Sequence, residues 1–102
     1  MAKVYAFVAD GMEEVECLAV CDCLRRAKVD VKLVSIMGRK MVTGSHGFKI
    51  EADSLFEEIT DDADVLFLPG GLAGTNNLKR GTEYLRGAWP RERPPRHMLS
   101  GL

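Results

Sequence analysis

The chain has 102 residues, 46% of them hydrophobic, which is enough for one domain and no more. Fourteen basic and fifteen acidic residues give a net charge of −1, which argues against a nucleic-acid or anionic-membrane binder, since such proteins carry a basic excess. No apolar run approaches the roughly 20 residues of a membrane-spanning helix, and three closely spaced cysteines indicate a reducing cytoplasm rather than a disulfide scaffold.

The first third of the chain alternates between strand and helix patterns. Residues 4–9 form a nearly continuous apolar run, which predicts a strand covered on both faces. A helix is expected over about residues 13–27, with Asp10 as its cap, and a second strand over residues 29–36. The apolar stripe of this helix is expected to consist of Val15, Leu18, Ala19, Leu24 and either Cys21 or Asp22.

The next segment predicts a hairpin followed by another strand. Residues 40–43 and 48–50 flank a polar turn, and a short helix capped by Asp53 is expected to follow the hairpin. The apolar run 63–68 predicts a third buried strand, and a further helix is expected over residues 76–86. Strands alternating with helices through short loops predict an α/β fold with a doubly wound parallel sheet.

Two features converge where the first and third predicted strands end, which is where such sheets bind ligands. Glycines in the Pro69–Thr75 segment let backbone N–H groups turn toward an anion, although a plain strand-to-helix turn explains Gly70 and Gly71 as well. Glu16 flanks the expected apolar stripe and could point into the same crevice. The sequence lacks the glycine patterns of nucleotide-binding loops.

The remaining polar and thiol groups have ordinary interpretations. Glu13 and Glu14 fit solvated acids in the first turn of a helix, and His46 fits a surface histidine in a glycine-flanked turn. Three cysteines, at positions 17, 21 and 23, lack the paired spacing of a zinc site and are expected to be small packed thiols.

Taken in order, these strings resemble the DJ-one/ThiJ/PfpI superfamily over about residues 1–86. The resemblance depends above all on Glu13-Glu14-Val15-Glu16 after the first strand and on Leu68-Pro69-Gly70-Gly71 after the third. It implies a flavodoxin-like sandwich, usually a cytoplasmic homodimer that needs no organic cofactor and no metal. The implied activities are those of a glyoxalase, a protein deglycase, a redox-sensing chaperone or a peptidase, and some members carry a thiamine-biosynthesis label. The implied substrates are small carbonyl compounds or glycated proteins.

The resemblance also assigns roles to three residues. Glu16 corresponds to the glutamate that lies against the nucleophilic cysteine, Gly71 to the donor of an oxyanion-site N–H, and Gly70 to its partner in the tight turn. That cysteine follows a fourth strand in an Ala-Ile-Cys-like string, which is absent here. The chain is therefore expected to hold only the N-terminal half of the fold, with a supporting shell and no nucleophile, and to be inactive.

The last residues differ in composition from the rest. Residues 87–102 contain three of the four prolines and show no strand or helix period, so they are expected to be a disordered tail outside the family domain. Without a fourth strand, the third would be an open edge and the product poorly soluble. Arg96-His97-Met98-Leu99 could be encoded by CGC-CAT-ATG-CTN, which shifted by one base reads Ala-Ile-Cys. A frameshift near residue 87 and a naturally truncated member are the two explanations.

Two other functions stay open beside an inactive remnant of a glyoxalase or deglycase. One is a non-catalytic dimerisation or redox/chaperone-like binding module that pairs with intact homologues. The other, ranked last, is a receiver-like or flavin-binding domain. A receiver needs an acidic residue where this chain has Leu68-Pro69, and a flavin binder needs a serine- and threonine-rich loop where this chain has Asp10–Glu13.

Overall fold

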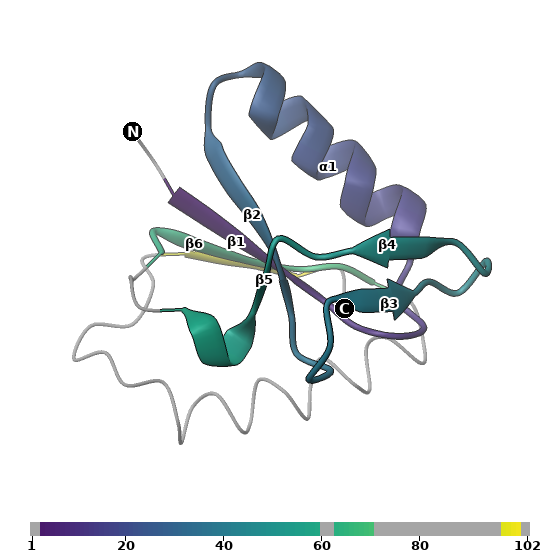
Figure 1. Ribbon diagram of the computed structural model, residues 1–102. Coiled ribbons are helices and arrows are strands. Elements are labelled where there is room, and N and C mark those ends of the chain that lie inside the picture. Colours follow the sequence, from purple (N-terminus) through teal and green to yellow (C-terminus); the bar gives the residue numbers. More distant parts are fainter. Residues whose placement is uncertain (1–2, 60–62, 71–96, 101–102) are drawn as a thin grey trace.

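A five-stranded parallel sheet forms the centre of the protein (Figure 1). The computed structural model describes residues 3–59, 63–70 and 97–100. The strand order is β5-β2-β1-β6-β7, and every neighbouring pair is parallel. The strands of this sheet are β1 (Lys3–Val8), β2 (Asp30–Ser35), β5 (Ser54–Leu55), β6 (Val65–Leu68) and β7 (His97–Ser100). The predicted parallel α/β sheet, with the first and third expected strands side by side, is confirmed.

β1 lies in the middle of the sheet, and its apolar sequence fits this place. Val4, Ala6 and Val8 belong to the core that α1 (Glu14–Arg26) covers, and Tyr5 and Phe7 belong to the core on the opposite face. Phe56, in the 3-10 helix η1 (Phe56–Glu58), packs edge-on against Phe7 at 6.2 Å between ring centres. Figure 1 shows α1 and η1 on opposite sides of the sheet, so β1 is buried from both directions.

The buried face of α1 differs from the expected one. Cys17 and Cys21 are buried, and Leu24 and Val20 pack partly against the same core. Val15 and Leu18, which were expected in the apolar stripe, are 63% and 41% exposed, and Ala19 is exposed as well. The prediction was right for Cys21 and Leu24 and wrong for Val15, Leu18 and Ala19, because the helix places the acid Glu14, rather than Val15, against the rest of the fold.

The hairpin prediction is confirmed, whereas both predicted helix caps are wrong. β3 (Met41–Thr43) and β4 (Lys49–Glu51) pair antiparallel beside the start of α1 (Figure 1). Asp10 accepts a hydrogen bond from the Thr43 N–H at 3.0 Å and pairs with Arg39, so it belongs to the hairpin side rather than to the helix.

Asp53 likewise caps no helix. Its carboxylate accepts the Leu33 N–H at 2.8 Å and pairs with Arg25 at 2.9 Å. The short helix expected after it is reduced to β5 and the single turn η1. Both aspartates therefore satisfy donors on other elements, a choice that a local sequence pattern does not reveal.

The expectation that no strand follows residue 86 is wrong, because His97–Ser100 forms β7 beside β6. β7 pairs in register from Val65 with His97 to Leu68 with Ser100. β6 is therefore not an open edge, and the poor solubility predicted on that ground loses its reason. β7 also contradicts the disorder expected over residues 87–102, at His97–Ser100; the rest of that tail and the helix expected over 76–86 lie outside the described residues.

Candidate functional site

The candidate site lies where β1 and β6 end next to each other. The Gly70 N–H donates a hydrogen bond to Glu16 Oε1 at 3.2 Å, and the Glu13 N–H donates to the Gly70 carbonyl oxygen at 2.6 Å. These two bonds run in opposite directions between the start of α1 and the end of β6. Residues 54 positions apart are thus held together, as the crevice rule for parallel sheets leads one to expect.

The sequence-predicted site residues fall into two groups. Glu16 and Gly70 are brought together, with Gly70 buried and Glu16 exposed at the surface of the helix. Gly71 lies outside the described residues. The arrangement places a carboxylate at the carboxyl end of β6, held by a backbone donor, where it could share a proton with a group arriving from a neighbouring strand.

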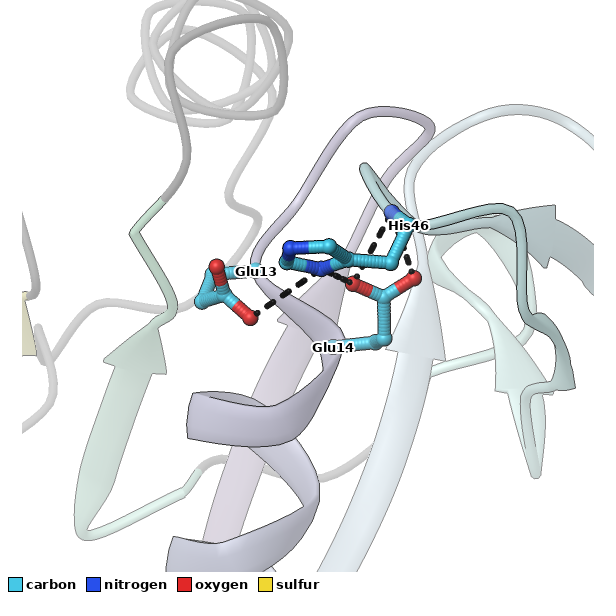
Figure 2. Close-up of side chains that lie close together, drawn as sticks. All are labelled: Glu13, Glu14 and His46. Carbon is cyan, nitrogen blue, oxygen red and sulfur yellow. Dashed lines mark hydrogen bonds and ion pairs between the residues drawn. The ribbon is translucent and has the colours of Figure 1, made fainter.

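A second polar cluster lies at the other side of the α1 start, and it is centred on Glu14 (Figure 2). This side chain is buried, although it is an acid in the first helical turn. Its carboxylate accepts the backbone N–H of His46 at 3.0 Å, the N–H of Phe48 at 3.4 Å and the Ser45 hydroxyl at 3.3 Å. The turn between β3 and β4 therefore wraps around a carboxylate supplied by α1.

The imidazole of His46 completes this cluster. Its Nδ1 lies 2.7 Å from Glu14 Oε1 and 3.6 Å from Glu13 Oε1, and the ring lies between the two acids in Figure 2. His46 is at the surface, as expected, with 58% of its side chain exposed. The expectation of a solvated Glu14 is wrong, because the fold supplies donors that replace water around its carboxylate.

The hydrogen bonds decide the charge of this pair. Burial raises the pKa of the Glu14 carboxyl, but the bonds from the His46 ring and the backbone N–H groups outweigh it and lower the pKa from 4.5 to about 2. The bond to Glu14, with the charges of Glu13 and Glu14, raises the pKa of His46 above its ordinary 6.5. Near neutral pH, Glu14 is therefore an anion that favours a protonated imidazole beside it.

The same three side chains bring possible metal-ligand atoms within 4.8 Å of one another. Both oxygens of Glu14 already accept backbone hydrogen bonds, and the imidazole nitrogen nearest to it faces an acceptor. These bonds account for the cluster without a cation. We therefore assign no metal to it.

The three cysteines of α1 have different surroundings, and the hydrogen bond with Cys17 lowers the pKa of Cys21. Cys17 and Cys21 are buried on the inner face of α1, which confirms their expected role as packed thiols, whereas Cys23 is exposed. A hydrogen bond to Cys21, followed by burial, raises the pKa of Cys17 well above its usual range. A thiol held in the neutral form among apolar side chains is a poor nucleophile.

Sequence reasoning missed the pairing of Glu14 with His46. The signal that existed was the turn Gly44-Ser45-His46-Gly47, in which Gly47 has a positive φ of 85° and a Cβ on Gly44 would overlap the Glu14 carboxylate. Nothing in the sequence connects that turn to an acid about 30 residues earlier.

Among the described residues, no helix is long and apolar enough to cross a membrane.

The parallel sheet with α1 on one face, together with the paired strand ends, defines an α/β protein of flavodoxin-like architecture. A sequence model of the DJ-1/PfpI family matches residues 2–88, so the chain belongs to the DJ-1/PfpI family. This confirms the resemblance seen in the sequence.

Relatives and solved structures agree with this assignment. Protein DJ-1 homolog B of Arabidopsis thaliana is 42% identical over 78 residues, which cover 76% of this chain and 18% of that protein. A protein of Pyrococcus abyssi named a deglycase is 38% identical over 72 residues, covering 70% of this chain and 43% of its own length. The crystal structure of Drosophila melanogaster DJ-1beta superposes with a TM-score of 0.76 at 31% identity, covering 84% of this chain and 48% of that one. The chain thus spans less than half the length of these relatives.

Proposed function

We propose that the chain is the N-terminal half of a cysteine-dependent glyoxalase or protein deglycase, and that it carries the supporting shell of the active site without its nucleophile. The observation that carries the proposal is the bond from the Gly70 N–H to the Glu16 carboxylate at the end of β6. Relatives that bear the name deglycase support the substrate class, which is small carbonyl compounds or glycated protein. The family resemblance gives the role of oxyanion N–H donor to Gly71, which lies outside the described residues.

The proposed reaction needs a thiolate next to the Glu16 carboxylate, and the chain has no cysteine at that place. In this class of reaction a thiolate attacks a carbonyl carbon, a carboxylic acid exchanges the proton, and backbone N–H groups stabilise the developing oxyanion. All three cysteines belong to α1, and none follows β6 in the sequence. We therefore expect the chain as given to be inactive.

The place of β7 supports the interpretation of residues 96–99 as a shifted reading frame. β7 runs parallel to β6 and ends opposite Leu68, directly before the Pro69-Gly70 turn. In the shifted frame the cysteine codon spans codons 98 and 99, and Met98 and Leu99 pair with Leu66 and Phe67, so this cysteine would belong to the strand beside the one that leads to Gly70. The coding DNA tests the idea directly, because a frame shifted by one base must contain Ala-Ile-Cys around these codons.

An activity assay tests the function itself. The chain is incubated with excess methylglyoxal, and turnover beyond the stoichiometric reaction of its three thiols is measured. We expect none, and we expect turnover to appear in a version whose codons after about residue 86 are read in the shifted frame through the rest of the gene. In that version Glu16→Gln should lower kcat about 100-fold. Turnover by the chain as given, or an active Glu16→Gln variant, would contradict the proposal.

A dimerisation module is the second candidate, and exposed apolar side chains favour it. Val15 and Phe48 are 63% and 64% exposed, and the Phe48 backbone bonds to the start of α1. The family resemblance makes a second copy, or an intact cytoplasmic homologue, the partner. Sedimentation at micromolar concentration, of the chain alone and mixed with an intact homologue, tests this: a complex that Val15→Glu dissociates supports it, and a monomer in both samples contradicts it.

A further inference from the structure

The buried carboxylate of Glu14 connects two segments, the start of α1 and the β3–β4 turn. It receives the backbone of the β3–β4 turn, it holds the His46 ring, and it sits in the same helical turn as Glu13 and Glu16. Around it, the Ser45 N–H donates to the Met12 carbonyl oxygen at 2.8 Å, which ties the same turn to the loop before α1. The tip of the β3–β4 hairpin is thus hydrogen-bonded to the start of α1.

The start of α1 is in turn fastened to β6. The Glu13 N–H donates to the Gly70 carbonyl oxygen, and the Gly70 N–H donates to Glu16. Glu14 lies between these two glutamates in the sequence; its carboxylate and that of Glu13 both lie near the His46 ring, whereas the carboxylate of Glu16 contacts Gly70. The Glu14 cluster and the residues that contact Gly70 therefore share the first turn of α1.

We propose that Glu14 and His46 form a proton-linked positioning pair, which holds the β3–β4 turn against α1 when His46 is charged and thereby sets the contact between Glu16 and Gly70. The effect of the β3–β4 turn on the contact between Glu16 and Gly70 rests on the function proposed for that contact. The pairing of Glu14 with His46 does not rest on the proposed function. Glu14 acts through Glu16 and is a positioning residue rather than a catalytic one.

Proton linkage follows from what surrounds the imidazole. Among the residues that the structure describes, the ionisable groups within 4 Å of the His46 ring nitrogens are Glu13 and Glu14, both acids and both from α1. Asp10 and Arg39, which precede the hairpin in the sequence, form an ion pair with each other. Deprotonation of His46 therefore removes a cation from between two carboxylates.

The pH window has two edges. Because the pKa of His46 is raised in the folded state, its contribution is full below 6.5, the ordinary value, and is lost as the pH rises through the raised value. Because the pKa of Glu14 is lowered, its contribution is full above its ordinary 4.5 and is lost as the pH falls toward about 2. The pair should hold best between about pH 4.5 and pH 6.5.

An NMR titration of the complete chain from pH 5 to pH 9 tests the pair. We expect the His46 ring to titrate above 6.5, and the protection factors of the amides of residues 44–48 and of Gly70, which compare each exchange rate with its intrinsic rate at the same pH, to fall together as it deprotonates. Glu14→Gln is nearly isosteric and keeps an acceptor for the backbone N–H groups, so the pKa of His46 should fall and the pH dependence should vanish. Glu13→Gln, the matched control from the same turn, should lower the pKa of His46 less.

His46→Gln covers the case in which the Glu14 variant does not fold, because His46 is largely exposed and its loss leaves the turn backbone intact. This variant should lose the pH dependence of the turn between pH 6 and pH 9. Two results would overturn the inference: a His46 titration that Glu14→Gln leaves unchanged, or turn amides whose protection factors are equal at pH 5.5 and pH 8.5. Turn amides that respond while Gly70 does not would refute only the link to the proposed site, and no outcome depends on enzymatic activity.

Discussion

The two faces of α1 reverse the usual relation between polarity and burial. On the inner face an acid, Glu14, is 1% exposed and two thiols are buried beside it. On the outer face Val15 and Leu18 lie largely in the open. The difference shows that burial in this helix depends on what the neighbouring elements offer, and not on side-chain character alone.

Glu14 can be buried on the inner face of α1 because its carboxylate has hydrogen-bond partners there. The β3–β4 turn presents two N–H donors and a hydroxyl to one carboxylate, so burial costs Glu14 little of its hydrogen bonding. The outer face has no described element across from it. Two exposed apolar side chains such as Val15 and Leu18 cost little stability by themselves, and they stabilise an assembly only if another surface covers them.

The largest expected effect compares the same substitution on the two faces. Cys17→Gln forces a longer, polar side chain into the core and should lower the free energy of unfolding by about 2–4 kcal/mol. Leu18→Gln, one position on, should change it by no more than about 0.5 kcal/mol. Urea unfolding followed by circular dichroism measures both, and equal effects would mean that the described helix phase is wrong.

A middle-sized effect is expected from the turn that encloses Glu14. Gly44→Ala places a methyl group where the Glu14 carboxylate lies, so the turn or the side chain must shift, at about 1–3 kcal/mol of unfolding free energy. Gly47→Asn is the matched control, because a Cβ there meets open space and asparagine tolerates the positive φ. It should cost less than about 1 kcal/mol. A Gly44→Ala chain as stable as the parent would show that the turn does not clasp Glu14.

The smallest effect is expected at Glu16, which lies on the exposed part of the helix. Its single described bond, to the Gly70 N–H, is 3.2 Å long and partly exposed. Glu16→Gln should therefore change the free energy of unfolding by less than about 0.5 kcal/mol, while shifting the Gly70 amide resonance. A loss of more than 1 kcal/mol would instead make Glu16 a structural residue.

Prediction from sequence succeeded where the pattern is local and continuous. The apolar runs at residues 4–9 and 63–68 predicted β1 and β6, and the rule for parallel sheets then brought Glu16 near Gly70. It failed for Asp10 and Asp53, which look like helix caps but satisfy donors on a hairpin and a strand. A short polar side chain has many possible partners, and the nearest in sequence is often not the one that the fold supplies.

The sequence by itself determined the family, the parallel sheet and the absence of a cysteine after β6, because these depend on residue order and on apolar runs. Only the tertiary structure decided that Glu14 is the buried acid of α1, that Val15 is exposed and that β7 covers β6. Four residues after a proline-rich segment carry too little periodicity to predict a strand, and they form one here because β6 offers a row of unpaired backbone groups. Glu14 is buried for a similar reason, since the donors that satisfy it come from a turn about 30 residues away.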